Sequence, residues 1–401
     1  MTDLTKEDVE YLLTPQAIRD TTAAVYKNAL EGGTHFKVHE NKLNDCADFV
    51  LDVIYKNYPS LKIPFHSRWG HFQVGGVDRI KLFDDKVAQC DSLEKARRKI
   101  ELAITSVLLD AGAGPEWSYK EIDKVYNRSE GLAVASFHLF LEGSFSEKNE
   151  CLADAKGLQA FSKETLEKGF QVDENNPLVG VQGRVALIQK LGETVKDNKY
   201  FPGDRPGGMI DYLIAHKGDQ FKVQDILEVV LKGLGSIWPG RIQSHGVNLG
   251  DVWHYSSFGD FSAQSVVCFH KLSQWLTYSL VGPIEEAGLS VSGAEELTGL
   301  AEYRNGGLFL DFGVIELKDP SLLNQSHLPQ SDLIIEWRAL TIQLLDRIGQ
   351  LVQNRLQKSP ADFPLAKVLE GGTWWAGRKL AKQKRSDSSP PLKLESDGTV
   401  F

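Results

Sequence analysis

A repeating apolar stripe between residues 331 and 357 constrains the fold of this chain more than any other feature of its sequence. Apolar side chains recur there at steps of three and four, which places them on one face of an α-helix. The stripe consists of Leu333, Trp337, Leu340, Leu344, Ile348 and Leu351. Because this face has to pack against a core, the stripe predicts a buried helix in a mainly helical protein.

The same reasoning predicts helices along most of the chain. Asp91 to Glu94 (DSLE) is typical of a capping box that opens a helix, and Gly112 and Gly114 would end that helix. We expect another helix over 262–281, and one that begins at Ser292 and ends at the Asn305-Gly306-Gly307 run. Further helices are expected near 8–30, 41–57, 118–142, 182–196 and 223–233.

Strand signals are few, which favours a mainly α protein with a small β element. The clearest are 307–317 (GLFLDFGVIEL) and 72–81. We find no Ser- or Pro-rich linker, so we predict one compact helical domain over 1–383. The polar, Pro-bearing residues 384–401 are expected to form a loosely held tail.

Charge and hydropathy exclude two classes of partner. The net charge is −9, and a negative field repels nucleic-acid phosphates and anionic lipid. The chain contains no run of 18 apolar residues, so we expect no membrane span. The acidic first residues do not resemble a signal peptide, and the four cysteines are far apart, so a cytoplasmic protein with reduced thiols is expected.

The segment 65–72 (FHSRWGHF) is the first candidate site, because it concentrates groups that bind ligands and move protons. Arg68 offers a planar fork for an anion, Trp69 offers a stacking face, and His66 and His71 can exchange protons near neutral pH. The alternative is a loop held by its aromatic side chains. The two histidines lack a third ligand at a suitable spacing, so we expect no metal.

Two helical positions add weaker candidates. Asp110 continues the apolar stripe of its helix at the C-terminal end, where the dipole disfavours negative charge, so it is either paired or functional. In the expected helix 262–281, His270 begins a polar stripe with Lys271 beside it. A solvated helix face is the alternative for that stripe.

The segment 301–311 (AEYRNGGLFLD) is the strongest candidate. We expect Glu302, Tyr303 and Arg304 in the last turn of a helix, two glycines that allow close approach, and then Asp311 in an apolar strand. Two carboxylates near a glycine turn suit glycosidic cleavage, because they stabilise an oxocarbenium-like state and activate water. A helix cap with an Arg304–Asp311 pair is the alternative.

Two C-terminal groups complete the candidates. Glu336 and Arg338 flank the core residue Trp337, and Trp374 and Arg378 lie among glycines in GGTWWAGR, where they would form an aromatic wall with an anion clamp or a packed cap. Nucleotide and zinc motifs such as GxGxxG, the Walker loop and HExxH are absent from the sequence. Nucleotide-driven and hydride chemistry are therefore disfavoured, and glycosidic hydrolysis requires no cofactor.

Long blocks of this sequence resemble the uracil-catabolism protein 4 family, over about residues 8–380. The blocks are HSRWGHF, LLDAGAGPEWSY, EGLAVASFHLF, FPGDRPGG, FHKLSQWLTYSL, GLAEYRNGGLFLDFGV, EWRALTI and GGTWWAGR. The resemblance implies a role in uracil use, downstream of a ribosylated pyrimidine whose ring opening leaves a ribosylurea-type intermediate.

A more distant similarity concerns the mechanism. FHKLSQWLTYSL followed by GLAEYRNGG resembles the queuosine-salvage nucleoside hydrolases, which have a helical fold akin to DNA glycosylases. Lys271, Glu302, Tyr303 and Arg304 match the Lys-bearing helix and the acidic-Tyr-Arg motif of that family. The chain departs from the pattern in having Glu302 where Asp is usual and Asn305 where Pro follows.

Together these observations predict an N-glycosyl hydrolase that cleaves a ribosylurea-type riboside or its 5-phosphate. Glu302 or Asp311 would stabilise the oxocarbenium and activate water. Cationic side chains would bind phosphate, and Trp69 or Trp374 would stack on a planar amide or base. The alternatives are a phosphoribosyl or glycosyl transferase, and a non-catalytic metabolite sensor or accessory subunit. The sequence leaves the oligomeric state open.

Overall fold

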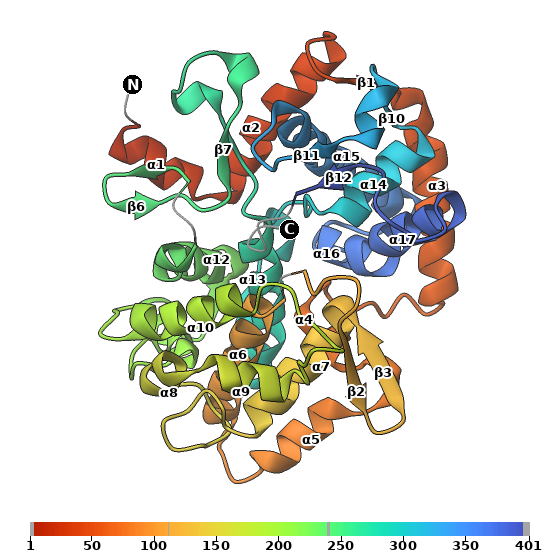
Figure 1. Ribbon diagram of the computed structural model, residues 1–401. Coiled ribbons are helices and arrows are strands. Elements are labelled where there is room, and N and C mark those ends of the chain that lie inside the picture. The colour runs from red at the N-terminus through yellow and green to blue at the C-terminus, as the bar shows by residue number, and fades with distance from the viewer. Residues whose placement is uncertain (1–3, 111, 239–240, 396–401) are drawn as a thin grey trace. The chain divides into compact units, whose positions relative to one another are not determined.

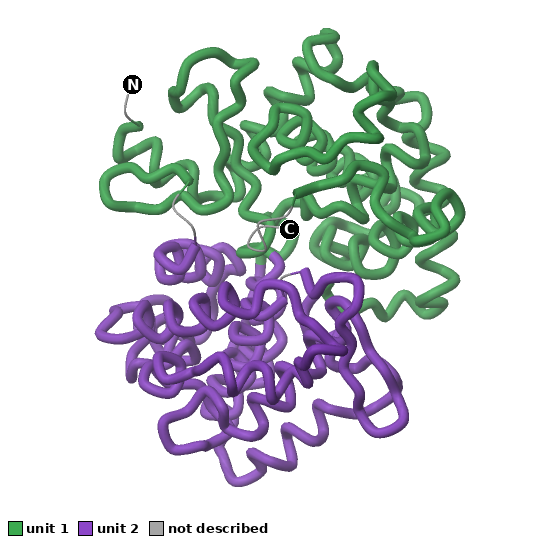
Figure 2. The backbone as a smooth tube through the Cα atoms, in the orientation of Figure 1, with its two compact units in different colours: residues 1–66, 240–274, 293–401 green, residues 67–239, 275–292 purple. Residues whose placement is uncertain are grey.

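The structure is a computed structural model that describes residues 4–110, 112–238 and 241–395. It is mainly helical, with short strands that pair two by two (Figure 1). Contacts within the chain divide it into two compact units, shown in Figure 2. Unit 1 comprises residues 1–66, 240–274 and 293–401, and unit 2 comprises residues 67–239 and 275–292.

Unit 1 is built around the long helix α15, which covers Asp332–Leu356 and confirms the helix expected from the apolar stripe. Every residue from Leu333 to Leu345 is buried, so the helix lies in the core on all sides rather than on one face. The other helices of the unit are α1 (Lys6–Leu12), α2 (Pro15–Leu30), α3 (Leu43–Asn57), α14 (Tyr303–Phe312), α16 (Leu365–Val368) and α17 (Trp374–Lys384).

Short strand pairs connect distant segments of unit 1. Antiparallel pairs join β1 (Phe36–Val38) to β10 (Ile315–Leu317), and β7 (Val252–His254) to β8 (Val266–Cys268). A parallel pair joins β11 (Ser326–His327) to β12 (Lys393–Leu394), which brings the end of the described chain back onto the unit. The hairpin of β5 (Gln243–Ser244) and β6 (Val247–Asn248) is the remaining pair.

Unit 2 is centred on α6 (Ser92–Leu108), in which every residue from Lys99 to Leu108 is buried. The Asp91 side chain accepts the backbone N–H of Glu94 at 2.7 Å, which confirms the helix start expected there. The other helices are α4 (Arg68–Phe72), α5 (Arg79–Lys86), α7 (Arg128–Leu141), α8 (Ala155–Ala160), α9 (Lys163–Gly169), α10 (Val181–Val195), α11 (Met209–Lys217) and α12 (Val223–Gly233). Its strands are β2 (Ser118–Glu121), β3 (Lys124–Asn127), β4 (Gln220–Lys222) and β9 (Ser290–Ser292).

The helix expected over 262–281 begins later than the sequence predicts. Helix α13 covers Lys271–Glu286, while residues 266–268 form β8 against β7. The β-branched pair Val266-Val267 suits a strand, and His270 has a left-handed φ of 45° that interrupts any continuous helix.

The helix predicted from Ser292 to the Asn305-Gly306-Gly307 run is wrong. A short 3₁₀ turn covers 294–296, and α14 begins only at Tyr303. The two glycines lie inside α14 because Gly306 packs closely on the core. A Cβ at Gly306 would lie 2.8 Å from Trp337 Cε2, so the position needs the absence of a side chain rather than a turn.

Three other expectations are also corrected. The strand expected over 307–317 is limited to β10, because residues up to Phe312 belong to α14. Residues 72–81 form helical turns instead of a strand. The helix expected over 118–142 is a β2–β3 hairpin followed by α7, because Tyr119 and Tyr126 pair across the two strands.

Candidate functional site

A small cavity in unit 1 lies where the start of α14 meets α15. It has an empty volume of about 190 Å³, and it has space inside for about one water molecule. Its walls come from Ala301, Glu302, Tyr303, Trp337, Arg338, Thr341 and Leu394. Glu302, Tyr303 and Arg338 were candidates from the sequence, so the structure brings three of them to one cavity.

Glu302 is the N-cap of α14 and not a residue in the last turn of a helix, as the sequence suggested. Its Oε1 accepts the N–H of Asn305 at 2.6 Å, and its Oε2 accepts the N–H of Arg304 at 2.9 Å. The residue is 8% exposed. The helix N-terminus therefore holds the carboxylate in one orientation and stabilises its negative charge.

Arg338 also lines the cavity and is held by Asp251. The two terminal nitrogens of Arg338 donate to Asp251 Oδ1 and Oδ2, each at 2.8 Å. The guanidinium also lies 4.0 Å from the ring centre of Phe269. Burial opposes the charge of Asp251, but the adjacent Arg338 lowers the pKa of Asp251 below its ordinary value. The fork of Arg338 is thus committed to a protein carboxylate.

The same aspartate anchors the start of α13. The backbone N–H of Lys271 donates to Asp251 Oδ2 at 3.0 Å, so Lys271 and the cavity residue Arg338 share one carboxylate. His270 is buried, its Nε2 lies 2.7 Å from the carbonyl oxygen of Leu12, and burial lowers the pKa of this imidazole. The left-handed backbone at His270 turns the chain so that α13 starts at the carboxylate.

Trp337 contributes an unused donor. Its Nε1 is buried and has no hydrogen-bond partner among the described residues. A buried N–H without a partner is costly, and a water or ligand oxygen that reached this nitrogen would satisfy it. The sequence suggested a core packing role for Trp337, and the structure places it in the core as well as in the cavity wall.

Arg304 and Asp311 both bind the C-terminal residues of the chain. Arg304 lies over the ring of Tyr303, 5.1 Å from its centre, and its Nη1 donates to the carbonyl oxygen of Ser388 at 2.8 Å. Asp311 accepts both terminal nitrogens of Arg385. The Arg304–Asp311 pair considered from the sequence is therefore replaced by two contacts with residues 385–388.

Asp311 does not face the cavity with Glu302. It lies in α14, nine positions after the N-cap, which corresponds to roughly 13 Å along the axis and the opposite face of the helix. Paired glycosidase carboxylates are about 5 to 9.5 Å apart. The structure therefore brings Glu302 to the cavity without Asp311.

Glu336 is buried on another face of α15. Its Oε2 accepts the backbone N–H of His35 at 2.8 Å and lies 2.8 Å from His35 Nδ1, while its Oε1 accepts the hydroxyl of Tyr255 at 2.7 Å. These bonds join three distant segments of unit 1. Glu336 does not line the cavity, and its contacts are those of a structural carboxylate.

His66, Trp374 and Arg378 form a separate group in unit 1. His66 Nδ1 lies 2.8 Å from Glu370 Oε2, and its ring centre lies 6.1 Å from that of Trp374. Arg378 lies over the rings of Trp374 and Trp375, at 5.3 and 5.5 Å. These three residues therefore come together, as an aromatic and cationic group on and beside α17.

The remaining candidates, Arg68, Trp69, His71 and Asp110, belong to unit 2. Arg68 is fully buried, pairs through Nη1 with Asp110, and donates through Nε to Ser106 Oγ at 2.8 Å. Burial lowers the pKa of Arg68 despite the adjacent carboxylate. Trp69 Nε1 donates to the carbonyl oxygen of Ser279 at 2.6 Å, and His71 packs edge-on against Trp275.

The comparisons with known proteins now identify the family. A family model described as "Protein of unknown function (DUF1688)" matches residues 11–401. The chain belongs to the DUF1688 family. "Uracil catabolism protein 4" of Lachancea kluyveri is 38% identical to it over 436 residues, which cover 98% of this chain and 99% of the relative. "Protein urg3" of Schizosaccharomyces pombe is 40% identical over 411 residues, covering 99% and 100%. The resemblance to the uracil-catabolism protein 4 family is confirmed.

The main residue of this DUF1688 site that sequence reasoning missed is Asp251. It lies in the apolar segment LGDVW, and a carboxylate in such a segment is a signal for a buried ion pair. The local sequence does not identify Arg338 as the partner of Asp251, because the two residues are 87 positions apart. Thr341 and Leu394 were also missed, because each is an ordinary packing residue by its pattern.

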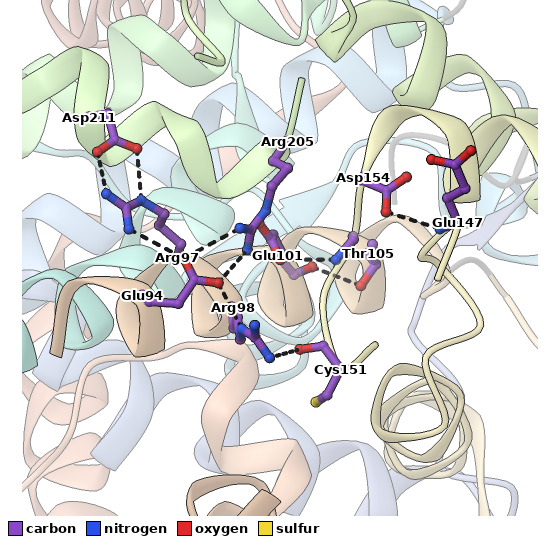
Figure 3. A network of polar contacts seen from close by, with 11 residues as sticks. Glu94, Arg97, Arg98, Glu101, Thr105, Glu147, Cys151, Asp154, Arg205 and Asp211 are labelled. Atoms are coloured by element: carbon purple, nitrogen blue, oxygen red, sulfur yellow. Dashed lines mark hydrogen bonds and ion pairs between the residues drawn. The ribbon is translucent and has the colours of Figure 1, made fainter. Parts of the chain in front are cut away.

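A second charged network in this DUF1688 chain lies within unit 2, where Glu101 is fully buried on α6 (Figure 3). Glu101 Oε1 accepts Arg205 Nε at 2.8 Å, and Oε2 accepts the N–H of Ala153 at 2.9 Å. Burial raises the pKa of Glu101 to about 7, against the opposing effect of Arg205. Arg205 also binds Glu94, which ties the loop 200–208 to the helix.

Two further findings concern only the described residues of the DUF1688 chain. None of the helices described there combines the length and hydropathy that a membrane crossing requires. Within residues 4–110, 112–238 and 241–395, no three His, Cys, Asp or Glu side chains are grouped so that they could hold a metal ion.

Proposed function

We propose that this protein acts in uracil or pyrimidine catabolism as an N-glycosyl hydrolase for a ribosylurea-type riboside. The observation that carries the proposal is a cavity lined by both Glu302, whose carboxylate is held by the start of α14, and Trp337, whose Nε1 has no hydrogen-bond partner among the described residues. The relative from Lachancea kluyveri is named for uracil catabolism, which supports the pathway.

The proposed reaction uses the charge of Glu302. Water oxygen bonds to C1′, the C1′–N bond breaks, the water loses a proton and the leaving nitrogen gains one. Positive charge develops on the sugar during this step, and a carboxylate held by a helix N-terminus requires no reorganisation to stabilise it. Trp337 Nε1 would donate to the water or to an oxygen of the substrate.

The arrangement of Lys271 supports the distant similarity to nucleoside hydrolases. Lys271 and Glu302 are separated in the sequence, but both are connected to Arg338: Lys271 through Asp251, and Glu302 through the common cavity wall. We also propose that the helical arrangement is of the DNA-glycosylase type found in that family.

The test is incubation of the purified protein with synthetic ribosylurea and its 5-phosphate, with urea release as the readout. Glu302→Gln is expected to lower the rate about 10²- to 10³-fold, because it removes the charge and keeps the shape. The matched control is Glu31→Gln, since Glu31 is an exposed carboxylate of the same unit. Absence of urea from both compounds with correctly folded protein would contradict the proposal.

A metabolite sensor without turnover is the second candidate. It is favoured by the two hydrogen bonds of Glu302, because both carboxylate oxygens already accept backbone N–H groups of α14 rather than a water molecule. A sensor would bind ribosylurea without releasing urea, and Glu302→Gln would leave its protein contacts intact. Calorimetric binding without product formation would therefore select the sensor over the hydrolase.

A further inference from the structure

Residues 385–395, here called the C-terminal strap, pack along α14 within unit 1, from Asp311 near its end to Arg304 at its start. The first attachment is Arg385, whose guanidinium makes a two-point ion pair with Asp311 at 2.5 and 2.8 Å. Its Nε also donates to the carbonyl oxygen of Ser389 at 2.7 Å, which folds the strap back on itself. The Asp311 side chain is 5% exposed, so the first anchor is largely shielded from water.

The middle of the strap lies against the glycine-containing turn of α14. Arg304 Nη1 donates to the carbonyl oxygen of Ser388 at 2.8 Å. A Cβ at Gly307 would lie 3.1 Å from Pro391 Cδ, so the strap touches the helix where it has no side chain. Leu392 is fully buried, which gives the strap an apolar anchor as well as polar ones.

The end of the strap reaches the cavity. Strand β12 pairs with β11 in parallel, and the N–H of Glu395 donates to the carbonyl oxygen of His327 at 3.0 Å. This pairing positions Leu394 in the cavity wall together with Glu302, Tyr303 and Trp337. The strap thus supplies one wall of the cavity that Glu302 also lines.

We propose that the C-terminal strap is a lid, which closes the Glu302 cavity and lifts to admit a ligand of riboside size. The closed cavity has space for about one water molecule, which is far less than the roughly 300–1,000 Å³ of ligand pockets. The other wall residues lie on α15 or at the start of α14. Leu394 instead lies on β12, which is held by a two-residue strand pair. The size of the ligand rests on the proposed function, whereas the lid itself rests on these contacts.

Arg304 connects ligand binding to the lid. Its guanidinium holds the strap through a single neutral carbonyl, that of Ser388. A carboxylate or phosphate oxygen would bind the same guanidinium more strongly than a carbonyl does, because the bond is then charge-assisted on both sides. A ligand anion that reaches Arg304 therefore displaces the strap from its middle attachment.

The test is hydrogen exchange on the full-length protein, with Asp311→Asn and Arg385→Gln as variants that release the first anchor. We expect amide exchange in residues 386–395 and 301–306 to become at least about tenfold faster in both variants. The matched control is Asp211→Asn, which breaks an equivalent two-point pair with Arg97 in unit 2. That control should leave exchange in both segments unchanged.

The outcomes separate the lid from the proposed function. Unchanged exchange in 386–395 and 301–306 for both folded variants would overturn the lid. Ribosylurea 5-phosphate, which carries the anion that Arg304 would bind, should accelerate exchange in 386–395 of the unmodified protein while protecting 301–306, and protection of both segments together would also overturn the lid. If neither the unmodified protein nor any variant releases urea, the hydrolase proposal fails. The lid is tested separately, by comparing amide exchange between the variants and the unmodified protein.

Discussion

Asp251 and Arg338 form a two-point ion pair, with both N–O distances at 2.8 Å, between the loop before β7 and the central helix α15. The Asp251 side chain is 10% exposed and that of Arg338 is 2% exposed, so the ion pair is largely shielded from water. Asp251 also accepts Trp253 Nε1 and the N–H of Lys271. This one carboxylate therefore positions both the start of α13 and one wall of the Glu302 cavity.

Asp251→Asn is expected to lower the free energy of unfolding by about 3 to 5 kcal/mol, because it leaves the Arg338 charge buried without its partner. The measurement is urea denaturation at neutral pH. Asp211→Asn is the comparison, since its pair with Arg97 is partly exposed and breaking it should cost under about 1 kcal/mol. Equal losses for the two variants would refute the special role of Asp251.

Glu101 gives a pH dependence of stability. Because burial raises the folded-state pKa of Glu101 to about 7 from its ordinary value of 4.5, the folded state binds this proton more tightly than the unfolded state. Its contribution to stability is therefore full below about pH 4.5 and declines as the pH rises toward 7. Glu101→Gln, measured by denaturation at several pH values, should flatten this part of the stability profile. A profile identical to that of the unmodified protein would show that Glu101 does not titrate in this range.

Gly306→Ala should destabilise the protein by about 1 to 3 kcal/mol, because the new Cβ would lie 2.8 Å from Trp337 Cε2 and 2.9 Å from Thr341 Oγ1. Gly183→Ala is the control within a helix. Its Cβ would meet nothing within 4 Å, so that variant should be neutral or stabilising by up to about 1 kcal/mol. Thermal unfolding of both variants distinguishes close packing from helix propensity, and a stable Gly306→Ala variant would contradict the packing argument.

Glu302→Ala is expected to cost about 1 to 2 kcal/mol of stability, because the N–H groups of Arg304 and Asn305 lose their acceptor. Glu302→Gln keeps one amide oxygen and should cost less. Chemical denaturation of the two variants tests the capping role separately from any activity. A stability loss below about 0.3 kcal/mol for the alanine variant would show that the cap contributes nothing.

Local signals in the sequence were sufficient for several helices and for several candidate residues. Helix α15 follows from its apolar spacing, and α6 follows from the Asp91 cap and the apolar run behind it. Both depend on contacts within four positions, which a sequence displays directly. The motif around Glu302 was also visible, but the sequence predicted a helix that ends there, whereas α14 begins directly after Glu302.

The boundaries of α14 and the partners of the buried charges required the tertiary structure. Gly306 and Gly307 are typical of a helix end, but packing against Trp337 and Pro391 overrides that local preference. Asp251 finds Arg338, and Asp311 finds Arg385, across 87 and 74 positions respectively. Such pairs carry no local signature.

The sequence by itself determined the helical class of this protein, its family, and the residue types available for chemistry, because periodicity, capping and motif blocks are local properties of the chain. Only the tertiary structure decided that Glu302 caps α14 at a cavity, that Asp311 instead anchors the strap, and that Leu394 closes the wall. The physical reason is that burial and charge pairing depend on which distant segments pack together.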